Sequence, residues 1–444
     1  MADAHGTVLH LWERDCSTQR RHQKVLEEAP APTISPEVRA LVTGSAVALA
    51  QAVGYTNAGT VEFLLDSDSG DVYFLEMNTR LQVEHPVTEE VVRVRGQRID
   101  LVEQQLLVAA GEPLGFTQDD VAVAGHAMEA RIYAEDAFGG FLPQAGTATR
   151  VRWPAAAGST AVRVEAGLED GTVVPAAYDP MVGKIISHGA DREAARQALV
   201  DALDDTAIGG LVTNTGFVRA LADSGAFRDG EVHTAWLDAH PLPAPDPGPA
   251  LVAAAWTVAA DAARDGGDGW RLAGPPADTW VELDDVVLRV STARGEVRRG
   301  GEPPTSCRAA GGAAGGAGMG GAGGLELLEL DGVTARFVVD VRPRSVEVST
   351  RGHTFRFTRP GGSRAAEADL SDGVVVAAMP GSLTRVEVRD GEAVTAGQAL
   401  GVLEAMKMEL ALVAPSDGVV RVRAAAGEQV AARQVLFVLE VPDA

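Results

Sequence analysis

An internal repeat near the C-terminus constrains the fold more than any other feature of the sequence. The fourteen residues from Gly391 to Glu404 match those from Gly427 to Glu440 at nine positions, with an offset of 427 − 391 = 36. Each copy joins short valine-rich runs to glycine turns, a pattern typical of β-strands. Such a repeat can bury its apolar side chains between two sheets related by a pseudo-twofold axis. It therefore predicts an all-β domain over residues 373–444.

The remaining residues divide by composition. At roughly 100–200 residues per domain, 444 residues predict two to four domains. Residues 238–250 are rich in proline and predict a semi-rigid linker. Residues 251–370 contain alternating and apolar runs and predict a β-rich middle region, whereas 93–237 predict a mixed α/β domain. Residues 1–92 precede them, so we expect an α+β chain of several domains.

Local signals predict several elements. The apolar residues 8–12 predict a buried strand, and Ser35 followed by Pro36 predicts the start of a helix that ends near Gly54. Residues 60–65 and 72–76, separated by a turn-rich segment, predict a β-hairpin. Residues 191–203 have helical periodicity.

Composition excludes several classes of function. Lys and Arg number 38 against 62 Asp and Glu, a net charge of −24. This balance argues against broad binding to nucleic acid or to an anionic membrane. The two cysteines allow no disulfide framework and suit the reducing cytoplasm, and no apolar stretch is long enough to span a bilayer.

The segment 76–84 alternates between polar and largely apolar residues. Its even positions are Glu76, Asn78, Arg80, Gln82 and Glu84. If the segment is extended, these side chains share one face. Two carboxylates and an amide oxygen on that face suit a hard cation such as Mg²⁺. The alternative is an edge strand with a solvated, charged face.

Two further features add candidate site residues. Glu62 is an acid among apolar residues, where burial would demand a metal or a cationic partner, unless it faces solvent. Residues 13–24 form a basic island in an acidic chain, which suits an anionic ligand such as phosphate or bicarbonate. The alternative for this island is a solvated loop.

Several long motifs together resemble biotin carboxylase, a family with the ATP-grasp fold. They include Glu-Arg-Asp-Cys-Ser at 13–17 and Glu-Met-Asn-Thr-Arg-Leu-Gln-Val-Glu-His-Pro at 76–86. Other matching segments are 19–24, 27–32, 129–136, 141–143 and 178–184. The resemblance implies that residues 1–92 are part of an ATP-grasp domain and that 93–237 are the C-terminal α/β domain of biotin carboxylase.

Residues 404–408, Glu-Ala-Met-Lys-Met, resemble the biotinylation site of biotin carrier domains, which have a barrel-sandwich fold. The resemblance implies that Lys407 carries biotin. Lipoyl domains share this fold but place their lysine in a different context. Carboxylase, middle region and carrier in this order resemble the α subunit of an acyl-CoA carboxylase, in which the middle region would dock the carboxyltransferase β subunit.

The resemblance also implies roles for single residues. Glu62 and Glu76 would hold Mg²⁺ or Mn²⁺ on ATP, with help from Asn78, and Gln19 and His22 would line the nucleotide or phosphate region. Glu84 would take the proton of bicarbonate as the general base. Arg131 would stabilise the biotin enolate. The residues that would position bicarbonate are Lys24, Arg80, Gln82 and the backbone of Val83.

The resemblance begins inside the ATP-grasp domain, so the family's N-terminal domain and glycine-rich lid have no counterpart in this sequence. We therefore expect the chain alone to be a poor or inactive carboxylase. Two other functions stay open: a biotin carrier and docking protein without catalysis, and a lipoyl carrier. The resemblance also implies biotin protein ligase as a partner and an oligomeric complex, in the cytoplasm.

Overall fold

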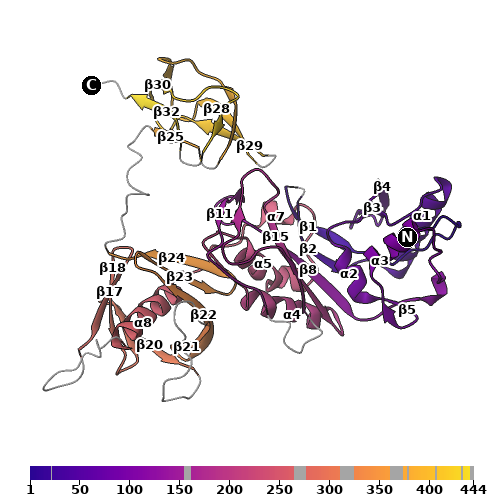
Figure 1. Ribbon diagram of the computed structural model, residues 1–444, viewed down its shortest axis with the longest axis horizontal. Helices are drawn as coiled ribbons and strands as arrows, with labels where there is room; N and C mark the ends of the chain where they lie inside the picture. The colour runs from indigo at the N-terminus through magenta and orange to yellow at the C-terminus, as the bar shows by residue number, and fades with distance from the viewer. Residues whose placement is uncertain are drawn as a thin grey trace.

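The computed structural model describes residues 1–21, 23–154, 162–264, 277–310, 325–360, 374–377, 380–405, 408–431 and 434–440. The ribbon shows a mixed α/β body formed by the N-terminal half of the chain, a β-rich middle region around a helix and a separate all-β C-terminal region (Figure 1). The prediction of an α+β chain of several domains is confirmed. In the part of the chain that is described, no helix is long and apolar enough to cross a membrane.

A five-stranded antiparallel sheet forms the centre of the body, in the order β1-β2-β8-β15-β13. The helix α4 (Arg192–Asp204) lies where helical periodicity predicts it, with Asp191 as its N-cap, and covers one face of this sheet with α5 (Thr215–Ala222). The short helix α2 (His85–Val91) covers the other face. The strands are β1 (Asp15–Arg20), β2 (Gln23–Ala29), β8 (His126–Tyr133), β13 (Val162–Ala166) and β15 (Met181–Gly189).

The register of the central sheet separates an apolar face from a charged one. On the face that α4 covers, Leu26, Ala130 and Ile185 pair across three strands and join the main core. On the face that α2 covers, Glu27 pairs with Glu129, and Arg131 pairs with Lys184. Because successive strand residues point to opposite faces, the charged side chains gather under α2.

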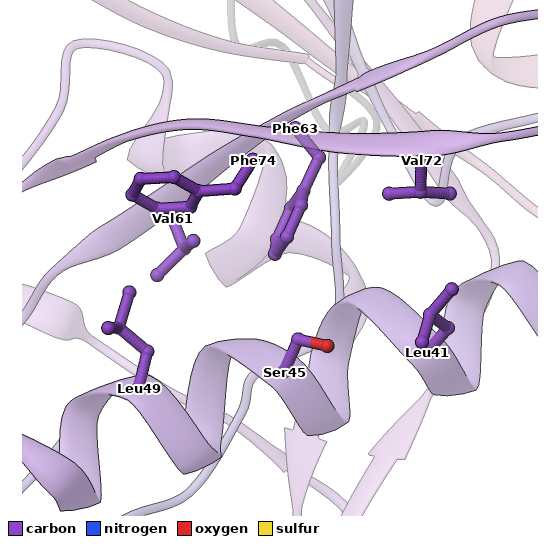
Figure 2. Close-up of a pocket in the computed structure, with 7 residues that line it drawn as sticks. All are labelled: Leu41, Ser45, Leu49, Val61, Phe63, Val72 and Phe74. Atoms are coloured by element: carbon purple, nitrogen blue, oxygen red, sulfur yellow. The ribbon is translucent and has the colours of Figure 1, made fainter.

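The N-terminal hairpin lies beside this sheet. It consists of β3 (Thr60–Leu65) and β4 (Val72–Asn78), as predicted, and packs on α1 (Pro36–Ala52), whose N-cap is the predicted Ser35. An apolar cavity of about 320 Å³ remains between helix and hairpin (Figure 2). Its lining residues are Leu41, Ser45, Leu49, Val61, Phe63, Val72 and Phe74.

Short elements connect these parts of the body. The predicted strand at 8–12 is wrong, because this segment contributes only an isolated bridge between Val8 and Ala2. The other elements are β5 (Val92–Val94), β6 (Gln97–Arg98), α3 (Leu101–Ala109), the 3-10 helix η1 (Gln118–Asp120), β7 (Val121–Val123), β9 (Glu135–Asp136), β10 (Leu142–Pro143), β11 (Gly146–Thr147), β12 (Arg150–Arg152), β14 (Val173–Val174), β16 (Ala207–Gly209), α6 (Gly225–Arg228) and α7 (Trp236–Ala239).

The middle region is an antiparallel meander of eight strands that curls around one helix, α8 (Gly248–Arg264). The helix begins at Gly248 with Pro249 in its first turn, so the predicted linker 238–250 overlaps the end of α7 and the start of α8. The strands are β17 (Thr279–Leu283), β18 (Val286–Ser291), β19 (Glu296–Arg299), β20 (Thr305–Ala309), β21 (Leu325–Leu330), β22 (Val333–Val341), β23 (Ser345–Thr350) and β24 (His353–Thr358).

The C-terminal region has the two sheets that the repeat predicts, in the orders β25-β32-β30-β27 and β29-β28-β26-β31. Each copy of the repeat places its short strand in the sheet of the other copy's long strand, so the two copies are intertwined. The strands are β25 (Val374–Val376), β26 (Gly381–Val386), β27 (Ala393–Val394), β28 (Ala399–Ala405), β29 (Met408–Val413), β30 (Gly418–Val422), β31 (Gln429–Val430) and β32 (Val435–Glu440).

Candidate active site

The segment that carries most predicted site residues does not continue as a strand. β4 ends at Asn78, and the chain leaves the sheet before α2 begins at His85. Pro86 in the first turn favours helix initiation, and the His85 N–H donates to the Gln82 carbonyl at 3.2 Å. The expectation that residues 76–84 alternate along one extended strand is therefore wrong. The turn moves Glu84 away from the hairpin and over the central sheet.

Glu84 lies at the centre of a cluster of cationic side chains. Its carboxylate is 2% exposed and accepts hydrogen bonds from Lys24 Nζ at 2.7 Å and from Arg131 Nη2 at 2.8 Å. Arg14 Nη2 lies 3.9 Å from the same carboxylate. Lys24 comes from β2 and Arg131 from β8, so the central sheet brings together residues more than a hundred positions apart.

These cations control the protonation of Glu84. Burial acts to raise its pKa, but Arg14 and Lys24 outweigh burial and lower the pKa to about 2. The carboxylate is therefore ionised at neutral pH, and its proton affinity is low as long as both cations stay beside it. A ligand that draws Lys24 or Arg131 away would raise this pKa.

The turn before α2 is held from both sides. Lys184 Nζ donates to the Val83 carbonyl at 2.8 Å and pairs with Glu165 at 2.7 Å. Gln82 is buried, and its Nε2 donates to Glu62 Oε1 at 2.8 Å, while its Oε1 accepts from Arg14 at 3.1 Å. The backbone around Val83 is thus fixed by side chains of the central sheet.

Glu62, Glu76 and Asn78 form a second group on the hairpin. Asn78 Nδ2 donates to Glu62 Oε1 at 3.1 Å and to Glu76 Oε1 at 2.9 Å, so two carboxylates converge on one point. Glu62 also pairs with Lys24 at 3.1 Å, and hydrogen bonds from Gln82 and the charge of Lys24 lower its pKa against the effect of burial.

This donor set fits Mg²⁺ or Mn²⁺. Within the described residues, no cluster of three or more His, Cys, Asp or Glu could hold a metal ion. However, Mg²⁺ in nucleotide sites commonly uses one or two carboxylates and takes its other ligands from phosphate and water. The two carboxylates of Glu62 and Glu76 meet this requirement.

Two predicted site residues, Gln19 and Arg80, do not join these contacts, and two others lie outside the described residues. Arg80 is exposed, and its Nη1 donates to the Leu81 carbonyl at 3.3 Å, away from Glu84. Gln19 pairs with Lys24 in the register of β1 and β2, but no side-chain contact joins it to the Glu84 cluster among the described residues. His22 and Lys407 lie outside the described residues, although β28 and β29 pair up to Ala405 and Met408 on either side of the segment that contains Lys407.

Sequence reasoning did not assign Glu27, Glu129 or Lys184 to the site, and it placed Arg14 there only as part of the basic island 13–24. Each lies inside a motif that the resemblance covers, so residue type and motif membership were the available signals. Glu129 also carries the signal that identified Glu62, because it is an acid on a strand of largely apolar residues, whereas the strand of Glu27 is mostly polar. Their register, which places one opposite the other, could not be read from either strand alone.

Three family models match the chain. They are the ATP-binding domain of the carbamoyl-phosphate synthase L chain at residues 1–117, the biotin carboxylase C-terminal domain at 129–239 and the biotin-requiring enzyme model at 373–439. Among solved structures, biotin carboxylase from Campylobacter jejuni with a bound ATP analogue is 41% identical, with a TM-score of 0.50 over 54% of this chain and 51% of that one.

A Hydrogenobacter thermophilus 2-oxoglutarate carboxylase domain, solved with MgADP and bicarbonate, is 40% identical, with a TM-score of 0.51 over 54% of this chain and 51% of that one. Methylcrotonoyl-CoA carboxylase subunit alpha of Arabidopsis thaliana is 37% identical over 98% of this chain and 65% of its own length. Propionyl-CoA carboxylase alpha chain of Ruegeria pomeroyi is 36% identical over 99% and 69%. Among the curated relatives, which include methylcrotonoyl-CoA carboxylase α subunits from other organisms, the matched part covers between 31% and 69% of the relative's own length. From these matches and from the order of its parts, the chain belongs to the family of biotin-dependent acyl-CoA carboxylase α subunits.

Proposed function

We propose that the chain acts in ATP- and bicarbonate-dependent carboxylation of biotin on Lys407, for transfer to an acyl-CoA by a partner subunit. The observation that carries this proposal is the buried Glu84 carboxylate between Lys24 and Arg131. A carrier without catalysis would gain nothing from keeping a buried acid among cations, because such clusters are costly to desolvate.

The cluster suits proton abstraction from bicarbonate. Lys24, Gln82 and the Val83 backbone bind the anion beside Glu84, and Arg80 closes over it from the exposed side of the turn. When bicarbonate draws Lys24 toward itself, Glu84 loses part of the charge that lowers its pKa to about 2 and becomes a stronger base. The base is therefore weak in the empty site and stronger when bicarbonate is bound.

Arg131 serves the second half of the reaction. Once Glu84 has taken a proton, its hold on Arg131 weakens, and Arg131 becomes available for the enolate oxygen that biotin develops. The same arginine thus links proton transfer at Glu84 to activation of biotin.

The metal ion and the nucleotide would bind beside the hairpin. Glu62 and Glu76 would hold Mg²⁺ or Mn²⁺, with Asn78 beside them, and Gln19 and His22 would lie along the nucleotide phosphates. The metal, when bound, would neutralise charge on the phosphates of ATP.

The partners follow from the same function. Lys407 requires biotin protein ligase for loading and then delivers its carboxyl group to a carboxyltransferase β subunit, docked through residues 251–370, in an oligomeric complex. Tethering raises the effective concentration of biotin at both sites. We propose 1–92, 93–237, 251–370 and 373–444 as the domains, and the cytoplasm as the compartment, since a chain with only two cysteines suits a reducing environment.

The test uses the tagged complex isolated from its source cells. Labelled bicarbonate should become attached to the chain in an ATP-dependent manner, and Lys407→Arg should abolish both this label and the avidin signal. Glu84→Gln should reduce labelling by about a hundredfold or more while avidin still detects the chain.

Glu90→Gln is the matched control, because Glu90 is also buried on α2 but pairs with Arg98. It should label like the wild type. Full labelling in Glu84→Gln, or a wild type that carries biotin but never incorporates label, would contradict the proposal.

A further inference from the structure

Two buried carboxyl groups lie beneath the proposed site and have no role in the reaction described so far. Glu27 on β2 and Glu129 on β8 are direct cross-strand partners and are 1% and 0% exposed. Both side chains lie on the face of the sheet that α2 covers. Acids this deeply buried are rare unless something in the site requires them.

Their surroundings distinguish the two acids. Arg131 Nη2 lies 2.5 Å from Glu27 Oε1, whereas the ion pair between Glu129 Oε1 and Lys184 Nζ is longer, at 4.0 Å. Within the described part of the chain, neither carboxyl group accepts a hydrogen bond. Two buried carboxylates on directly paired residues cannot both be ionised without a large cost in free energy. Burial and Glu27 raise the pKa of Glu129 well above its usual range, and burial raises the pKa of Glu27 to about 7 against the pull of Arg131.

Arg131 therefore contacts two acids with one nitrogen. Nη2 reaches Glu84 Oε2 at 2.8 Å and Glu27 Oε1 at 2.5 Å. Glu84 gives up its negative charge when it accepts a proton, and its attraction for Arg131 then falls. Glu27 lies on the sheet beneath Glu84 and takes no part in that proton transfer, so its own attraction for Arg131 is left in place.

We infer that Glu27 is the positioning residue that holds Arg131 in place for biotin after Glu84 has been neutralised, and that Glu129 shares one proton with Glu27 so that this pair stays singly charged. The inference rests on the proposed function and deepens it. It assigns the buried pair to the biotin half of the reaction and leaves the bicarbonate half to Lys24 and Glu84.

The test separates bicarbonate activation from biotin carboxylation. It uses the tagged complex with Lys407→Arg, which cannot carry attached biotin, so that free biotin can be added or withheld. Glu27→Gln should lower kcat for carboxylation of free biotin about tenfold to a hundredfold, with the KM values for ATP and bicarbonate within about twofold. Bicarbonate-dependent ATP hydrolysis without biotin should change by less than about threefold. Glu27→Asp, which keeps the charge, should recover part of the lost kcat.

Glu28→Gln is the matched control, because Glu28 is the next residue on β2 and is equally buried, but pairs with His126 and Arg192 on the opposite face. It should leave both activities within about twofold of the parent. Thermal unfolding of each variant reports whether a loss of activity is a loss of folded protein.

A second readout does not depend on activity. In the full chain labelled with ¹³C at glutamate carboxyl carbons, one carboxyl should stay protonated at neutral pH, in a site faced by Glu27, Glu84, Arg131 and Lys184. This signal should vanish in Glu129→Gln and persist in Glu28→Gln.

The outcomes are distinct. If Glu27→Gln lowers both activities equally, if it matches Glu28→Gln, or if no carboxyl stays protonated at neutral pH, the inference is wrong. If the parent complex carboxylates no free biotin at all, the proposed function fails instead.

Discussion

The central sheet and the N-terminal hairpin carry similar charged side chains in very different settings. Glu27, Glu84 and Glu129 lie on or over the sheet and are almost fully buried. On the hairpin, Glu76 is exposed, and its neighbours Tyr73 and Phe74 are each more than half exposed. Figure 2 shows the apolar cavity that remains between this hairpin and α1.

The difference shows which half of the site is preorganised. Lys24, Arg131 and Lys184 fix the geometry around Glu84 from three strands that already share one core. The hairpin pairs its two strands only with each other in the described sheets, so its acids are placed by local contacts such as those of Asn78. We therefore expect substitutions on the sheet to affect stability strongly and those on the hairpin to affect it weakly.

The largest effect should come from the core of the sheet. Ile132→Ala removes a fully buried side chain from β8 and should destabilise the body by about 2–5 kcal/mol, because the cavity cannot collapse. Phe74→Ala on the hairpin, where the ring is 55% exposed, should cost less than half as much. Hydrogen exchange of β2 and β8 amides measures both. Equal losses of stability in the two variants would show that the sheet and the hairpin do not differ in this way.

Glu84→Gln should cause the next largest loss of stability. The displacement of the Glu84 pKa from 4.5 to about 2 corresponds to about 3 kcal/mol of stability at neutral pH. This contribution is present above pH 4.5 and is lost as the pH falls toward 2, because the folded state then no longer gains from ionisation. The difference between variant and wild type in urea unfolding should shrink over that range. A difference independent of pH would show that Glu84 acts through packing instead.

Glu129→Gln should change the stability in the opposite direction from Glu84→Gln: the variant should be more stable than the wild type at neutral pH. A raised carboxyl pKa means that the folded chain keeps a proton that the unfolded chain releases above pH 4.5. The stability of the wild type therefore falls as the pH rises above 4.5. The glutamine side chain in the variant does not titrate, so the variant does not lose stability in this way. The variant should be more stable than the wild type at neutral pH, and this gain should shrink near pH 4. Destabilisation at every pH would indicate an ionised, well-paired Glu129.

Glu76→Gln should have the smallest effect on stability. The side chain is exposed and accepts one hydrogen bond from Asn78, so the cost should stay within about 0.5 kcal/mol. Mg²⁺ binding, followed by calorimetry with ATP present, should weaken by about tenfold because one of two carboxylates is lost. Unchanged Mg²⁺ affinity would place the metal elsewhere.

Much of the local structure follows from short-range patterns. Ser35 and Pro36 begin α1, Asp191 caps α4, and the turn-rich segment after Leu65 closes the hairpin. The residues around α8 were different: its alanine-rich sequence follows a proline-rich segment, so the helix that fills the middle meander was not predicted. The signal was nevertheless present, because alanine has the highest helix propensity and Pro249 suits the first turn of a helix.

By itself, the sequence determined the intertwined C-terminal sheets, the main helix starts and the residue types of the site, because repeats, caps and motifs act over short stretches of chain. Only the tertiary structure decided that the chain turns after Asn78, that Glu84 meets Lys24 and Arg131, and that Glu27 faces Glu129. The physical reason is that register and burial are set by strands far apart in sequence, and the same residues would be solvated and unshifted on an isolated strand.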